Sequence, residues 1–348
     1  MKFLSDKALD RLRDAGDAPD LAGTRYVLLE CVARGGMGVI YAARDEKLDR
    51  RVALKVLDVE DRGDELARRL VREAQVLAQL EHPGIVPVHD VGALQDGRVF
   101  YTMKFVEGQR LDKHLEFVES IPDRLRLFLR ICDAVAFAHA RGVLHRDLKP
   151  ANVMVGSFGE VLVLDWGLAK ILTDAARSAT TGDPEETIVE PARTESGEAS
   201  ETTEFSATTA HGTVMGTPGY MSPEQARGDN ARLDERSDIF SLGALLRFLL
   251  MRETTASPAR ANLPGRVLDK SLEAICAKAT TADPQDRYAC VTQLALDVSQ
   301  YLDGLPVSAR RESFLDKVER FYRRNNVAIL LIAAYLVMRV ILLLISHR

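Results

Sequence analysis

A polar run between two apolar stretches carries the residue types best suited to moving a phosphoryl group. In VLHRDLKPANVMV, Asp147 is placed to accept a hydroxyl proton, and Lys149 follows two residues later, where its ammonium group could steady a phosphate. Asn152, five residues after Asp147, offers an oxygen ligand to Mg²⁺. Because burying these groups is costly without a purpose, the segment predicts a catalytic loop.

Three further residues extend this set. Asp165 follows the apolar strand predicted at VLVL, thirteen residues past Asn152, and could hold Mg²⁺ between phosphates. Lys55 in VALKVL lies 17 residues after Gly38, and Glu73 in VREAQVL is placed to pair with it. Taken alone, Lys55 and Glu73 are more typical of surface charges. The order of glycine loop, strand lysine and helix glutamate favours a nucleotide site instead.

The glycine loop itself, in CVARGGMGVIY, departs from the usual pattern. Ala33 stands where G-x-G-x-x-G would begin. Where φ is negative, alanine in place of glycine adds one methyl group and no backbone strain. Gly35 and Gly38, whose backbone would approach the phosphates, are both present. We expect weakened nucleotide affinity at most.

The elements that must position these residues change type along the chain. Strand patterns begin at Tyr26 with YVLLECVA, GVIYAARD and RRVALKVLDV, and two more strands are expected near IVPVHDVGAL and VFYTMKFVE. A helical segment, DELARRLVREAQVLAQLEH, lies between them, and helical patterns dominate after Gly108. This arrangement predicts an α+β fold of two packed lobes with a cleft between them.

Composition limits the classes of partner and compartment. Charged residues make up 28% of the 348-residue chain and the net charge is −5, so nucleic acid is not an expected partner. The four cysteines are far apart in sequence, which is typical of reduced thiols rather than of a disulfide or zinc framework. Residues 1–24 read as a polar extension with a short helix, and their apolar run is too short for a signal peptide.

Residues 173–213 have a different composition from the rest. This segment holds 14 Ser/Thr and 9 Asp/Glu residues but few large apolar side chains. It cannot bury enough apolar area to offset its ordering entropy, so we expect a disordered insert. The sequence leaves open whether the insert is regulatory or a passive linker.

Residues 327–345, VAILLIAAYLVMRVILLLI, predict one C-terminal transmembrane helix. At 1.5 Å per residue they would reach about 28 Å, against roughly 30 Å of hydrocarbon. Arg339 lies near one end, where it can snorkel, although a buried core helix is the alternative. The positive-inside rule then places the N-terminal bulk in the cytoplasm, at the cell (inner) membrane, because the preceding segment is basic. Its basic residues are Arg310, Arg311, Lys317, Arg320, Arg323 and Arg324.

The chain resembles the protein kinases, and specifically the bacterial eukaryotic-like (Hanks-type) serine/threonine kinases. The resemblance covers about Tyr26 to Leu302. It is carried by ARGGMG, VALK, the helix glutamate, HRDLKPAN, DWG, GTPGYMSPE, SDIFSLG and the arginine of DPQDRY. It implies a two-lobed kinase fold, with a small β-rich N-lobe and a larger α-helical C-lobe, that uses ATP with Mg²⁺ or Mn²⁺. DLKPAN and GTPGYMSPE imply Ser/Thr acceptors on proteins, the chain itself among them.

The resemblance also assigns roles residue by residue. Catalytic roles fall to Asp147, Lys149, Lys55 and Glu73, and metal binding falls to Asn152 and Asp165. The implied ATP-binding residues are Ala33, Arg34, Gly35, Gly36, Met37, Gly38, Val39, Lys55, Met103, Lys104 and Val106. The implied activation and structural residues are Arg146 (receiving an activating phosphate), Thr217 (contacting Asp147 and Lys149), Glu224 with its partner Arg287, and Asp238.

Several positions depart from the family pattern. Trp166 replaces the usual Phe and could alter the balance of active and inactive poses, and Ser222 replaces the alanine of A-P-E, a mild change. Residues 253–266 are short and polar where the family usually has a docking helix, which leaves substrate recognition open. The long insert prevents assignment of a phosphosite by spacing. The candidate phosphosites nearest GTPGYMSPE are Thr208, Thr209 and Thr213.

The predicted layout has four parts. An extension (1–24) precedes the kinase domain (25–302), whose N-lobe is 25–106 and whose C-lobe is 107–302, and a basic juxtamembrane segment (303–326) leads to the span (327–345). The expected activity is that of a non-specific serine/threonine protein kinase, membrane-anchored, that also phosphorylates its own activation loop. Its expected partners are protein substrates, membrane lipid and the chain itself, with a homodimer left open. The alternative is a catalytically weak pseudokinase that acts as a membrane-tethered scaffold, and a small-molecule kinase is disfavoured by GTPGYMSPE.

Overall fold

The computed structural model describes most of the two predicted lobes. The described residues are 18–35, 38–56, 64–166, 170–171, 217, 219–229, 233–251, 268–310, 335, 338 and 339. The predicted insert, the polar stretch 253–266, the three candidate phosphosites, and Gly36 and Met37 lie outside them, as does nearly all of 327–345. Within the described part of the chain, no helix has the length and apolarity needed to cross a bilayer.

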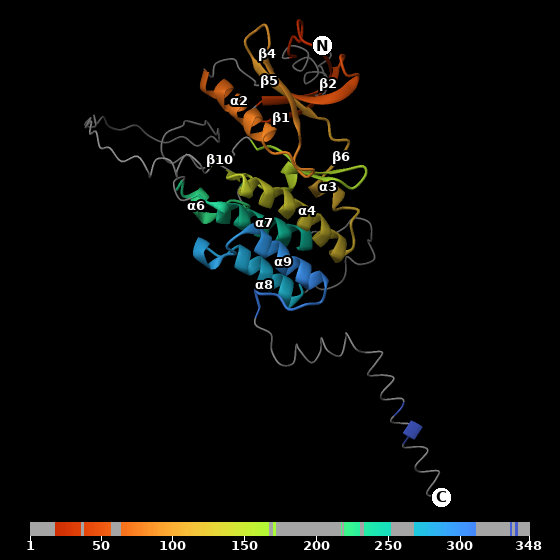
Figure 1. Ribbon diagram of the computed structural model, residues 1–348, viewed down its shortest axis with the longest axis vertical. Coiled ribbons are helices and arrows are strands. Elements are labelled where there is room, and N and C mark those ends of the chain that lie inside the picture. Colours follow the sequence, from red (N-terminus) through yellow and green to blue (C-terminus); the bar gives the residue numbers. More distant parts are fainter. Residues whose placement is uncertain are drawn as a thin grey trace, which may run out of the picture.

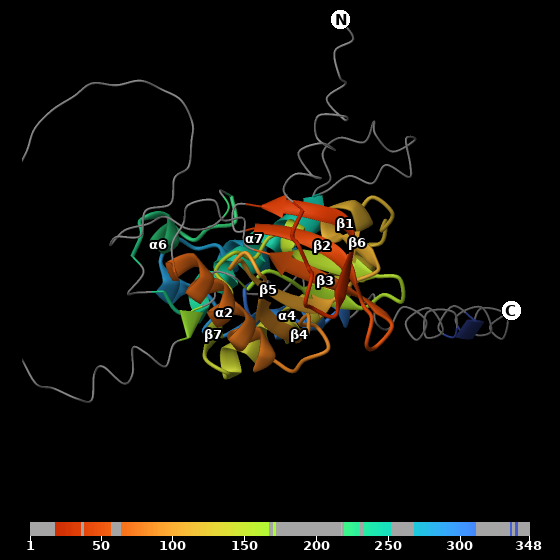
Figure 2. The same ribbon diagram turned by 90° about the horizontal axis from the view of Figure 1, so that it is seen from above.

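The N-lobe is a five-stranded antiparallel sheet with one helix beside it (Figure 1). Its strands, in spatial order, are β1 (Tyr26–Gly35), β2 (Gly38–Asp45), β3 (Arg50–Val56), β5 (Val99–Lys104) and β4 (Val88–Ala93). Helix α2 (Asp64–Ala78) packs against β5 and β4, and Figure 2 shows it beside the sheet from above. These are the five strands and the helix that the alternating and helical patterns predict.

The described residues of the C-lobe form four longer helices. These are α4 (Ile121–Ala140), α7 (Glu235–Met251), α8 (Lys270–Ala279) and α9 (Val291–Leu302), with the short helices α3 (Leu111–His114) and α6 (Pro223–Ala226). Gly243 allows α7 to approach α8 closely, because a Cβ there would lie 2.6 Å from the Cβ of Ala279. The helical patterns after Gly108 therefore correspond to a helical lobe.

Short strands occur in the described part of the C-lobe, and one of them, the apolar strand that precedes Asp165, was predicted. They are β6 (Gly108–Arg110), β8 (Val153–Gly156) and β9 (Val161–Val163) in one sheet, and β7 (Val143–Leu144) paired with β10 (Lys170–Ile171). Each has two to four residues, too few to show an alternating pattern. Turns of 3₁₀ helix, η1 (Pro150–Asn152) and η4 (Pro284–Asp286), lie in loops. Because β8 and β9 follow the catalytic loop directly, they fix its C-terminal side.

One apolar core joins the two lobes. A cluster of buried side chains runs from Leu77 of α2 through Trp166 at the cleft to Leu246 of α7 and Val298 of α9. A second cluster, around Tyr41, covers the other face of the N-lobe sheet. The lobes also share a backbone hydrogen bond, in which the Val163 N–H donates to the Gly84 carbonyl at 2.8 Å. The continuous core holds the residues on both sides of the cleft in a fixed relation.

Candidate active site

A chain of charges links the two lobes. The Lys55 Nζ on β3 lies 2.9 Å from Glu73 Oε1 on α2 and 3.1 Å from Asp165 Oδ1. The side chains of Lys55 and Glu73 are almost fully buried, whereas that of Asp165 is about half exposed. Burial opposes the charge on Lys55, but Tyr101, Glu73 and Asp165 together outweigh burial and raise the pKa of this lysine. The ammonium is therefore held charged and aimed toward the cleft.

Asp165 remains ionised for the same reason. Burial raises its pKa, but the ammonium of Lys55 outweighs burial and leaves the pKa below its ordinary value. Its backbone has φ 60°, in the left-handed region, at the point where β9 leads into the Asp-Trp pair. An ionised, partly exposed carboxylate beside a lysine is suited to binding a cation.

Tyr101 is a polar neighbour of this chain that sequence reasoning missed. Its hydroxyl donates to Glu73 Oε1 at 2.8 Å, the same oxygen that accepts from Lys55, and its ring is 1% exposed. Tyr101 pairs with Lys55 in the β3–β5 register, so both side chains face α2. Burial raises its pKa well above the ordinary value, so the hydroxyl stays protonated and donates. Only the strand pairing reveals this contact, because a tyrosine in an apolar strand carries no signal of its own.

The catalytic loop gathers its polar side chains around one carboxylate. Lys149 Nζ lies 2.6 Å from Asp147 Oδ2, and the Thr217 hydroxyl donates to Asp147 Oδ1 at 2.9 Å. Lys149 Nζ also donates to Thr217 Oγ1 at 2.7 Å. Asn152 Nδ2 donates to the Asp147 carbonyl and carboxylate at 2.9 and 3.1 Å. The four residues named from sequence are thus assembled, with Thr217 brought in from 70 residues away.

Asp238 of α7 supports this loop from beneath. Its carboxylate accepts the backbone N–H groups of His145 and Arg146, each at 2.8 Å, and it contacts His139 Nε2 at 2.8 Å. Arg146 has φ 69°, a conformation that a residue other than glycine keeps only when its surroundings hold it. The buried carboxylate therefore fixes the backbone just before Asp147. The histidine at position 139 was not predicted.

Trp166 fills the space between the catalytic loop and the core. The ring is fully buried, lies 4.6 Å from the His145 ring between centroids, and donates from Nε1 to the Val163 carbonyl at 3.3 Å. The larger aromatic is thus accommodated in a pose with Asp165 turned toward Lys55.

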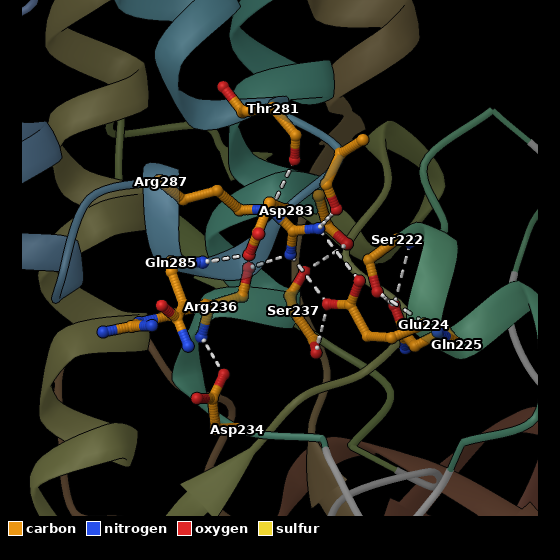
Figure 3. Close-up of polar contacts among 12 residues, drawn as sticks. Ser222, Glu224, Gln225, Asp234, Arg236, Ser237, Thr281, Asp283, Gln285 and Arg287 are labelled. Atoms are coloured by element: carbon orange, nitrogen blue, oxygen red, sulfur yellow. Dashed lines mark hydrogen bonds and ion pairs between the residues drawn. The ribbon is translucent and has the colours of Figure 1, made fainter.

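The end of the segment between Asp165 and Glu224 is anchored to the C-lobe by an ion pair (Figure 3). Arg287 Nη1 and Nη2 donate to the two oxygens of Glu224 at 2.7 and 2.9 Å, and the Ser237 hydroxyl donates to the same carboxylate at 2.9 Å. Burial raises the pKa of Glu224, but the hydrogen bonds from Arg287 outweigh it and lower the pKa to about 2. The pair implied by the sequence is present as a two-pronged contact.

The predicted nucleotide-binding residues lie where β1 leads into β2 and where β5 leads into the C-lobe. Gly35 pairs with Gly38 across the turn, and Val39 is buried beneath it. Among the described residues other than glycine, positive φ occurs at Asp49, Arg146 and Asp165, so Ala33 carries no backbone strain. Of the remaining residues, Arg34 is the second-last residue of β1, Met103 and Lys104 end β5, and Val106 follows them. The alanine therefore fits the loop.

Comparison with known proteins agrees with this geometry. The family model for the protein kinase domain matches residues 26–317. A serine/threonine-protein kinase PknD of Chlamydia trachomatis is 36% identical over 312 residues, which cover 81% of this chain and 32% of that protein. The PknD of Protochlamydia amoebophila is 34% identical over 315 residues, covering 80% of this chain and 30% of that protein. A crystal structure of the PknI kinase domain of M. tuberculosis matches with a TM-score of 0.54 and 23% identity, over 81% of this chain and 96% of that one.

The fold and the site thus define a protein kinase of two lobes. The chain belongs to the protein kinase family, and its curated relatives are named as serine/threonine kinases. It spans about a third of the length of those relatives.

Proposed function

We propose that the protein is an active serine/threonine protein kinase that transfers the γ-phosphate of ATP to hydroxyl groups of proteins. The observation that supports this most directly is that the structure assembles two groups of charged and polar side chains. Lys55, Glu73 and Asp165 are in contact, and Asp147 is in contact with Lys149 and Thr217. A chain that had lost catalysis would be expected to lack one of these charged residues.

Each side chain has a role that its contacts support. Asp147 accepts the proton of the acceptor hydroxyl, while Lys149, beside it, offsets negative charge on the transferring group. Lys55, held by Glu73, places a positive charge against the phosphates. Asn152 uses its amide nitrogen on Asp147, so its oxygen would bind a cation together with the ionised Asp165. Magnesium bound there would neutralise phosphate charge.

Membrane anchorage and self-phosphorylation are part of the proposal. The apolar run 327–345 and the basic residues before it support a single span with the kinase domain in the cytoplasm. The Ser/Thr-rich insert, residues 173–213, lies in sequence between Asp165 and Thr217, two residues of the site, so it is tethered close enough to be a substrate of its own active site. Removal of residues after Asn326 should release the protein from the membrane pellet of fractionated cells, and continued sedimentation would refute the anchor.

The alternative, a pseudokinase scaffold, is favoured by Ala33 and by the short polar stretch 253–266. The experiment that separates them incubates the detergent-solubilised full chain with Mg²⁺ and ATP, beside Asp147→Asn, and records intact masses with peptide mapping. The proposal expects stepwise addition of phosphate to the wild type alone. A folded wild type that binds ATP and gains no phosphate would support the scaffold.

A further inference from the structure

Gln225 joins the end of the activation segment to the backbone of the catalytic loop. It lies in α6 and is 3% exposed, and its Nε2 donates to the Arg146 carbonyl at 2.8 Å, across 79 positions of sequence. Its Oε1 accepts from the backbone N–H of Ser222 at 3.1 Å and from the Ser222 hydroxyl at 3.0 Å. A backbone N–H can only donate, so the amide oxygen must face Ser222 and the amide nitrogen must face Arg146.

This contact holds a peptide group that controls the catalytic carboxylate. The Arg146 carbonyl, the Asp147 N–H and the Asp147 Cα belong to one planar peptide unit. A hydrogen bond that holds the carbonyl therefore also restricts the position of the Asp147 Cα, from which the catalytic side chain extends. The N–H of Arg146 donates to Asp238 Oδ1 at 2.8 Å. Both peptide groups that flank the left-handed residue 146 are therefore held, one by α7 and one by α6.

Helix α6, which carries Gln225, is itself held in place by its neighbours. Glu224, the neighbour of Gln225, forms the two-pronged pair with Arg287. The Ser222 hydroxyl accepts from the backbone N–H of Gln225 at 3.4 Å, which completes a capping box at the start of the helix. Ser222 stands where the family has alanine, and alanine has no hydroxyl to offer the amide. The serine is therefore a larger change than its size suggests.

We infer that Gln225 is a positioning residue for Asp147, oriented by Ser222, and that it couples the end of the activation segment to the catalytic loop. The inference rests on the phosphoryl transfer proposed above. Gln225 acts through the Arg146 carbonyl, so its loss should reduce turnover rather than nucleotide binding.

The test compares three variants of the full chain in detergent. Gln225→Met keeps the side-chain length and removes the amide's hydrogen bonds to Ser222 and to the Arg146 carbonyl. Ser222→Ala removes a hydroxyl that both contacts the amide oxygen and caps α6, while the backbone N–H of residue 222 remains to hold the amide oxygen. Ser237→Ala is the matched control, because its buried hydroxyl donates to Glu224 Oε1 at 2.9 Å on the same support without touching the catalytic loop. The readouts are kcat, the KM for ATP, the melting temperature, and hydrogen exchange of the peptide covering residues 143–149.

Gln225→Met should lower kcat roughly tenfold with the KM for ATP within about twofold, and should speed exchange in residues 143–149. In kcat, Ser222→Ala should fall between Gln225→Met and the wild type, because the backbone N–H of residue 222 still holds the amide oxygen. The double variant should equal Gln225→Met in kcat but melt at a lower temperature, because the Ser222 hydroxyl also caps α6. Ser237→Ala should lower the melting temperature but leave kcat and loop exchange unchanged.

If Gln225→Met behaves like Ser237→Ala in both kcat and exchange, the inference is overturned. Should Gln225→Met fail to fold, Ser222→Ala decides, and an unchanged kcat with unchanged exchange would overturn the inference. A wild type without activity would refute the proposed function separately. In that case, hydrogen exchange of residues 143–149 would still test the contact between Gln225 and the catalytic loop. Faster exchange in Gln225→Met than in the wild type would support the contact, and equal rates would refute it.

Discussion

Replacing Tyr101 with phenylalanine removes a single oxygen atom from the interior of the active site. The hydroxyl donates to Glu73 Oε1 at 2.8 Å, while Lys55 Nζ lies 2.9 Å from the same oxygen. Tyr101 and Glu73 are 1% and 6% exposed, so bulk water does not replace the lost donor. The substitution therefore tests whether Glu73, and through it Lys55, needs a second anchor.

The size of the effect follows from the charge on the acceptor. A hydrogen bond to a charged group contributes about 1.5–3 kcal/mol. Lys55 still pairs with Glu73 in the variant, so we take the lower end, about 1.5 kcal/mol. At about 1.4 kcal/mol for each factor of ten, kcat/KM should fall roughly tenfold.

The assay measures initial rates of phosphate transfer at varied ATP and includes a double-mutant cycle with Glu73→Gln. In the Glu73→Gln background the carboxylate is absent, so Tyr101→Phe should change kcat/KM less than about twofold. Tyr288→Phe is the matched control, because its buried hydroxyl donates to Asp297 Oδ2 at 2.8 Å in the C-lobe. It should lower the melting temperature without changing kcat/KM. Equal losses from Tyr101→Phe in both backgrounds, or no loss in either, would refute the reasoning.

Three further outcomes concern stability. Burial lowers the pKa of His139, but the carboxylates of Asp238 and Glu235 outweigh burial and raise this pKa to about 9. The wild type should therefore exceed His139→Gln in unfolding free energy by a full margin below about pH 6.5, and this difference should disappear as pH rises through 9. Denaturant titrations across this range would show it, and a constant difference would contradict it. The pKa of Glu224 is lowered to about 2, so the wild type should exceed Glu224→Gln in unfolding free energy by a full margin above about pH 4.5. This difference should shrink as pH falls toward 2, and thermal melts at a series of pH values would measure it. Trp166→Phe leaves unfilled volume and removes the hydrogen bond from Nε1, which should cost about 1–2 kcal/mol, or roughly 2–6 °C in melting temperature. An unchanged melting temperature would show that the pocket closes around the smaller ring.

The sequence predicted the site residues well where the chemistry requires particular residue types a few positions apart. Asp147, Lys149 and Asn152 lie within six residues, and the order from Lys55 to Asp165 restricted the chain to one family before any contact was known. The five N-lobe strands and the long helices were also predicted, because their apolar periods extend over enough residues to be recognised. Of the two- to four-residue strands of the C-lobe, β9 was expected from the apolar run before Asp165, but the others were not, since so short a run has no measurable period.

The tertiary structure alone decided which ordinary residues serve the site. Tyr101 reaches Glu73 across 28 positions, and Gln225 reaches the Arg146 carbonyl across 79. Tyrosine in a strand and glutamine in a short helix are common, and neither has a neighbour in sequence that marks it. Their roles arise from packing, because burial beside a charged or backbone group makes a single hydrogen bond hard to replace with water. A linear sequence shows which groups are present, whereas only the folded chain determines which of them lose water together.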